Sequence, residues 1–96
     1  MTKAEIVEQI AGKTGIERAD VLEIVERFFK VVKESVTAGE TIYIRGFGSF
    51  EPKKRAAKTA RNISTNTLVN VPAHVAPKFK PAPEFVKRVK ENVRVE

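Results

Sequence analysis

Apolar residues recur every three or four positions through the first part of the chain, the spacing of amphipathic helices. Thr2 and Glu5 have the spacing of a capping box, so a first helix should begin there, with Gly12 and Gly15 bracketing its end. One face of this helix carries Ile6, Val7, Ile10 and Ala11.

A second, longer helix is predicted from about Arg18 to Ala38, with Gly39 as its C-terminal stop. Its apolar positions form two neighbouring stripes, Leu22, Val25, Phe29, Val32 and Val36 beside Val21, Ile24, Phe28 and Val31. A helix that is apolar on more than one face needs more partner surface than one short helix supplies. Part of it should therefore pack against a second chain.

Short strand-like runs follow the second helix. Residues 41–44 are predicted as a strand, 46–48 as a tight turn, and 49–51 as the start of a second strand. A long hairpin comes next, with strands in 53–61 and 67–71 joined by the polar turn Asn62-Ile63-Ser64-Thr65-Asn66. An isolated two-stranded ribbon is marginal in water, so we expect an arm that is mobile until it binds a ligand.

The chain should end in a third strand and a third helix. Residues 75–80 return to the sheet, and Pro81-Ala82-Pro83-Glu84 suits a helix start. Phe85, Val86 and Val89 would anchor this helix to the core. The expected fold class is α+β in a single domain, residues 1–96, with an arm at about residues 53–74.

The positive charge of the chain is concentrated in one segment. The net charge is +6, and from Pro52 to Pro83 there is no Asp or Glu beside seven basic residues: Lys53, Lys54, Arg55, Lys58, Arg61, Lys78 and Lys80. Each phosphate that Lys or Arg neutralises releases condensed counterions, so a nucleic-acid backbone is the natural partner of such a strip. From charge alone, a solvated basic surface explains the segment equally well.

Other functional classes find little support in the sequence. The chain has no Cys, which excludes disulfides, thiolate metal sites and thiol nucleophiles and fits a reducing compartment. Its small core then favours oligomerisation as the source of added stability. His74 has no candidate metal ligands nearby, and no nucleophile, base and orienting group occur together. We therefore expect no enzyme activity, catalytic residue, metal, cofactor or small-molecule substrate.

No signal peptide or membrane-spanning segment is recognisable in the sequence. The first residues lack an apolar signal core, and no uncharged stretch approaches the roughly 20 apolar residues of a membrane span. We expect a soluble, cytoplasmic protein without a membrane partner.

Gly46-Phe47-Gly48-Ser49-Phe50 and the run from Arg55-Ala56-Ala57 through Arg61-Asn62 resemble the bacterial HU/IHF family of DNA-bending proteins. Val71-Pro72-Ala73 and Pro77-Lys78-Phe79-Lys80-Pro81 continue the likeness over nearly the full length, closest to the HU branch. The resemblance implies a homodimer with a helical base, a three-stranded antiparallel sheet per chain and a long protruding β-ribbon arm. It also implies a histone-like, nucleoid-associated protein that binds double-stranded DNA through the minor groove with little sequence specificity, and bends and condenses it.

The resemblance also assigns DNA contacts by position. Those in the arm are Arg55, Lys58, Arg61, Asn62, Ile63, Ser64, Thr65, Asn66 and Pro72, and those in the body are Lys3, Gly46, Phe47, Gly48, Lys53, Lys78 and Lys80. The turn at 46–48 would offer backbone amides to a phosphate, because glycine allows close approach. The ring of Phe47, like those of Phe50 and Phe79, is expected to fill the core instead of stacking on bases.

Three arm positions depart from the usual family pattern. Ile63 stands where a proline commonly wedges between base pairs; isoleucine is apolar and compact enough to wedge but lacks the fixed φ of proline. Ile63 could also be an ordinary apolar loop residue. Asn66 replaces a common turn glycine and is the next-best residue for a left-handed conformation, and Ala60 replaces another frequent glycine. These changes affect the expected bend angle more than binding.

Several partner hypotheses remain open from the sequence. Bent, nicked or distorted DNA should be favoured, since prebending removes part of a deformation cost of order 1–6 kcal/mol. The alternatives are an IHF-like subunit with some site preference, binding of structured RNA through the same arms, and docking of the arm on an acidic protein. A-form RNA has a wide, shallow minor groove that would not grip a wedge.

Overall fold

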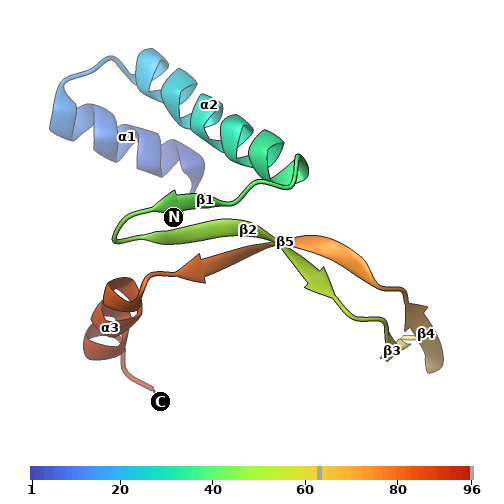
Figure 1. Ribbon diagram of the computed structural model, residues 1–96. Coiled ribbons are helices and arrows are strands. Elements are labelled where there is room, and N and C mark those ends of the chain that lie inside the picture. The colour runs from blue at the N-terminus through green and yellow to red at the C-terminus, as the bar shows by residue number, and fades with distance from the viewer. Residues whose placement is uncertain (63, 96) are drawn as a thin grey trace. The chain divides into compact units, whose positions relative to one another are not determined.

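The computed structural model describes residues 1–62 and 64–95. Its elements, in order, are α1 (Lys3–Thr14), α2 (Arg18–Thr37), β1 (Ile42–Ile44), β2 (Gly48–Arg55), β3 (Lys58–Asn62), β4 (Thr67–Val71), β5 (His74–Pro81) and α3 (Pro83–Asn92) (Figure 1). By their contacts they form two compact units, Met1–Glu34 and Ser35–Glu96. The three helices, the antiparallel sheet and the ribbon confirm the predicted α+β class.

The first unit is a helical hairpin whose limits follow from local caps. Thr2 Oγ1 accepts the Glu5 N–H at 3.3 Å, which is the predicted N-cap of α1. At the other end Gly15 adopts φ 76° and donates its N–H to Ala11 O at 2.9 Å. Val7 of α1 and Val21 of α2 are 1% and 2% exposed. These two valines form the small buried core of the hairpin.

Helix α2 keeps much of its apolar surface exposed in the single chain. Ile24 is 61% exposed, Val31 58% and Phe28 45%. The helix ends at Thr37, and Gly39 follows with φ 88° and its N–H bonded to Val36 O at 3.0 Å, as its place in the sequence predicted. Apolar area of this extent on one helix is consistent with the expectation that part of α2 packs against another chain.

The second unit contains a three-stranded antiparallel sheet in the order β1-β2-β5. A turn at 45–47 joins β1 to β2, with Gly46 at φ 80° and the Phe47 N–H bonded to Ile44 O at 3.0 Å. A side chain at Gly48 would collide with the Lys80 backbone and the Phe79 ring. Glycine is therefore required at both positions, at the first by conformation and at the second mainly by space.

The β3–β4 ribbon continues the β2–β5 pair in the same register. The last pair of the sheet is Arg55↔His74 and the first of the ribbon is Lys58↔Val71, so two residues intervene on each strand. Pro72 lies in this gap and has no N–H to donate, which accounts for the interrupted ladder. Because neither strand gains a residue, the alternation of side chains carries through from sheet to ribbon.

A cluster of phenylalanines holds α3 against the sheet. Phe79 lies 5.1 Å from both Phe47 and Phe50 between ring centroids, and Phe85 stacks on Phe47 at 5.4 Å. Phe50 is half-buried, as expected of a core residue, whereas Phe47 and Phe79 are 42% and 37% exposed and are buried less than predicted. Phe85 is half-buried, as expected of an anchor, whereas Val89 is 45% exposed and anchors α3 less than predicted.

Candidate nucleic-acid interface

The strand register sorts the basic residues onto two faces. Directly paired residues of an antiparallel sheet project to the same side. The pairs Ser49↔Lys80, Glu51↔Lys78, Lys53↔Ala76 and Arg55↔His74 therefore define one side. With the register continued into the ribbon, Arg61 belongs to the same side through its pair with Leu68. We call Lys53, Arg55, Arg61, Lys78 and Lys80 the basic face.

The opposite side is mainly apolar. It carries Phe50 and Pro52 of β2, paired with Phe79 and Pro77 of β5. Lys54 lies on this side as the partner of Val75, and Lys58 continues it into the ribbon as the partner of Val71. The resemblance placed Lys58 and Arg61 together along the arm, but the register puts them on opposite faces, because three positions separate them and strand side chains alternate.

The charges of the basic face are available to a ligand. Four of its five side chains are exposed, and Lys78 is half-buried. None of the five is within 4.0 Å of a carboxylate in the described ranges 1–62 and 64–95, where the ion pairs involve other residues. Glu51 is the acid on this side, directly opposite Lys78. The uncompensated cations leave a positive field along the sheet and ribbon, which favours a polyanion.

Short polar contacts join described residues that flank position 63 at the arm tip. Asn62 Oδ1 accepts the Ser64 N–H at 3.1 Å, and the Thr65 and Thr67 hydroxyls lie 2.6 Å apart. Asn66 adopts φ 53°, which confirms the predicted left-handed turn residue. Ile63, the expected wedge, lies outside the described residues. Ser64, Thr65 and Asn66 are exposed.

The body residues expected to contact DNA lie in both units. Lys3 belongs to the helical hairpin, where its Nζ is 3.3 Å from Glu26 Oε1 in an exposed ion pair. In the 46–48 turn, the Phe47 N–H is used within the turn itself. The Gly46 N–H has no acceptor among the described residues. The expectation that this turn offers amides to a phosphate therefore applies to the Gly46 N–H and not to the Phe47 N–H.

Two residues near this turn were not predicted from the sequence as site residues. Tyr43 is 81% exposed and pairs with Ser49, so it lies on the same side of the sheet as Lys80. Arg45 is exposed and lines a shallow hollow with Tyr43 and Lys80. The signal was present, since Tyr43 is the outward position between two inward isoleucines in a short strand.

The histidine and the carboxylates of the described residues do not form a further site. His74 Nδ1 lies 2.9 Å from the Pro72 carbonyl oxygen, next to the break in the ladder. Among the described residues no three His, Asp or Glu side chains gather as metal ligands. In the same part of the chain, no helix combines the length and apolarity needed to cross a membrane.

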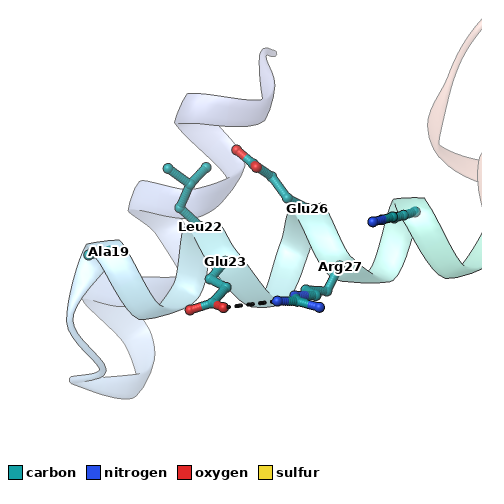
Figure 2. A pocket seen from close by; sticks show the side chains of 6 residues that line it. Ala19, Leu22, Glu23, Glu26 and Arg27 are labelled. Carbon is teal, nitrogen blue, oxygen red and sulfur yellow. Dashed lines mark ion pairs between the residues drawn. The ribbon is translucent and has the colours of Figure 1, made fainter.

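A hollow on the first unit lies along one side of α2, where Leu22, Glu23, Glu26 and Arg27 line it (Figure 2). Glu23 and Arg27 form an ion pair at 3.6 Å there, one turn apart. The mixed charges of this hollow contrast with the single sign of the basic face. It offers a polyanion no comparable surface.

Comparison with known proteins points to one family. The profile of the family described as "Bacterial DNA-binding protein" matches residues 1–90. The SPbeta prophage-derived DNA-binding protein HU 2 of Bacillus subtilis is 38% identical over 94% of this chain and 98% of its own length. Integration host factor subunit beta of Marinobacter nauticus is 41% identical over 98% of this chain and 97% of its own. The protein in an Anabaena HU–DNA cocrystal structure superposes with a TM-score of 0.84 at 30% identity, covering 94% of this chain and 98% of that one.

Proposed function

Because the chain belongs to the family of bacterial DNA-binding proteins, we propose that it binds double-stranded DNA with the basic face of its sheet and ribbon. It is a histone-like protein that binds and bends DNA, and it is not an enzyme. The five basic-face side chains are the observation that carries the assignment, since they lie on one side of a continuous register without an ion pair among the described residues. The site of action we propose is the bacterial chromosome.

Two adjacent lysines provide a matched test of this surface. Lys53 lies on the basic face and Lys54 on the opposite side, so Lys53→Gln and Lys54→Gln remove the same charge from neighbouring positions. Log affinity falls with log salt by about 0.9 for each neutralised phosphate. Lys53→Gln should reduce that slope by about 0.9 for each bound chain, whereas Lys54→Gln should change it little once salt screens charges beyond about 10 Å.

The assay is a binding titration of a short duplex at several salt concentrations. The parent protein should lose affinity steeply as salt rises. Equal losses of slope in the two variants would show that the basic face has no special part in binding. A parent affinity that barely responds to salt would argue against DNA binding by these residues altogether.

We propose that the functional form is a homodimer in which the exposed apolar side of α2 is covered. Ile24 is 61% exposed in the single chain, and Phe28 and Val31 on the same helix are exposed as well. An apolar patch of this kind on a protein surface marks an interaction site. Ile24→Glu should shift the protein from dimer to monomer in sedimentation equilibrium, because a carboxylate cannot be buried there without a partner. A parent that is monomeric at micromolar concentration would contradict the proposal.

We propose that Ile63 wedges between base pairs and that the protein prefers distorted DNA for the same reason. An apolar side chain at the arm tip would replace stacking lost at a kink, and a nick removes part of the bending cost. Ile63→Ala should bind intact duplex nearly as the parent does but lose preference for nicked duplex, with a smaller bend by end-to-end fluorescence transfer. An unchanged bend angle in this variant would exclude the wedge.

An IHF-like preference for particular sites is the second candidate, and the 41% identity to an integration host factor subunit favours it. Residues on the sheet that can reach base edges would then add to the phosphate contacts. Selection of bound duplexes from a random pool separates the candidates. An enriched sequence motif supports site preference, and a flat pool supports the histone-like reading.

A further inference from the structure

Glu84 lies directly against the turn that the resemblance assigns to DNA. A Cβ at Gly46 would be 3.6 Å from Glu84 Oε1 and 3.9 Å from Oε2. Two contacts fix this arrangement: the Ala82 N–H donates to Phe47 O at 2.9 Å, and Phe85 stacks on Phe47 with 21° between the ring planes. The first turn of α3 and the 46–48 turn are therefore packed together within the second unit.

The Glu84 carboxylate makes no ion pair within 4.0 Å in the described part of the chain, although Arg88, one turn further along α3, lines the same hollow. Arg45, the exposed neighbour of Gly46 in the chain, and Lys80 line a different hollow that also includes Gly46. Glu84 lies in the first turn of α3, an end of the helix at which negative side chains are common.

The Glu84 carboxylate lies 3.6–3.9 Å from where a Cβ of Gly46 would be, so a phosphate bound to the Gly46 N–H would lie within the roughly 10 Å over which charges interact at 0.1 M salt. The turn thus combines an amide without an acceptor, which attracts an anion, with a carboxylate that repels one. Repulsion of a unit charge in water corresponds to roughly a fourfold change in affinity per chain at about 5 Å and to roughly a twofold change at about 8 Å.

We propose that Glu84 weakens phosphate binding at the 46–48 turn and so directs contacts with the DNA backbone to the basic face. This inference rests on the proposed DNA-binding function. The residues assigned to the DNA-binding surface so far all favour binding. Glu84 would be a residue at that surface that opposes it.

Glu84→Gln tests the proposal, with Glu91→Gln as the matched control. Both changes remove one negative charge from α3, and the two positions lie seven residues apart, about 10 Å along the helix. Glu91 forms only an exposed pair with Lys87 at 3.9 Å, so its loss should matter little for folding. Glu84→Asp, which keeps the charge, is the second control.

Affinity for a short duplex is measured at several salt concentrations, with a thermal melt of each variant to confirm folding. Glu84→Gln should bind about two- to fourfold more tightly per chain at low salt, with a salt slope up to about 0.9 steeper per chain if the turn gains a phosphate. Glu91→Gln should show a clearly smaller gain, because its charge is more distant, and Glu84→Asp should bind as the parent does.

Equal gains for Glu84→Gln and Glu91→Gln would overturn the proposal, since only general charge would then matter. A gain for Glu84→Asp as large as for Glu84→Gln would also overturn it, because packing and not charge would be responsible. In both cases the parent still binds with its usual salt dependence. If the binding of the parent protein did not depend on salt, that result would instead contradict the proposed function itself.

Discussion

Replacement of Gly48 by alanine should destabilise the protein more than any other Gly→Ala change in the chain. A Cβ at this position would meet the Lys80 carbonyl oxygen, and would lie 2.8 Å from Phe79 Cε1 and 2.9 Å from Cζ. The first obstacle is backbone in a paired strand, and the second is a ring held among other phenylalanines. Neither can move freely, so the strand pair or the aromatic cluster must shift.

Alanine substitutions at two other glycines separate the steric part of this free-energy cost from the backbone part. Gly39 also has a positive φ, 88°, but a Cβ there would have nothing within 4 Å, so Gly39→Ala reports backbone strain alone. Strain of this kind costs on the order of 1 kcal/mol, and overpacking a well-filled site adds about 1–3 kcal/mol. Gly12 lies inside α1 in open space, and Gly12→Ala should stabilise by about 0.5–1 kcal/mol.

Thermal unfolding followed by circular dichroism measures all three variants at one fixed protein concentration, because an oligomer melts in a concentration-dependent way. For a chain of this size about 1 kcal/mol corresponds to roughly 4–8 °C. Gly48→Ala at about 3 kcal/mol should thus melt roughly 12–24 °C lower, well below Gly39→Ala. A Gly48→Ala variant that melts within a few degrees of Gly39→Ala would refute the steric argument.

Three further changes test local features of the fold. Thr2→Ala removes the acceptor of the Glu5 N–H and should lower the melting temperature by roughly 4–8 °C; an unchanged melt would mean that another group caps α1. Val7→Ala opens a cavity at a residue only 1% exposed and should cost about 2 kcal/mol in urea unfolding, while a cost under about 0.5 kcal/mol would show that the site collapses. Asn66→Val places a β-branched residue at φ 53° and should reduce amide-exchange protection in β3–β4 but not in α1, whereas Asn66→Gly should preserve it; equal protection in both variants would contradict the turn assignment.

The helices and turns could be predicted from the sequence because their signals act over a few residues. Thr2 and Gly15 limit α1 through contacts three to four positions away, and Asn66 adopts a conformation set by its own backbone preference. The strip of positive charge between Pro52 and Pro83 is likewise a property of the sequence. With the resemblance of the glycine turn and the arm, these features were sufficient to predict the fold class and the DNA-binding function.

The division of that charge between two faces required the register. Lys53 and Lys54 are neighbours in one basic run, and only the pairs with Ala76 and Val75 place them on opposite sides of a defined sheet. The separation of Lys58 from Arg61 has the same origin. Family resemblance assigns residues by position in the chain, and it does not say which way each side chain of a ribbon projects.

The proximity of Glu84 to Gly46 was decided by the tertiary structure alone. The two residues are distant in sequence, and they come to line one hollow because β2 pairs with β5 and because Phe85 stacks on Phe47. Caps, periodicity and charge are local and can be read along the chain. Which distant groups meet depends on the register of a strand pair and on the packing of rings, and these are fixed only when the chain has folded.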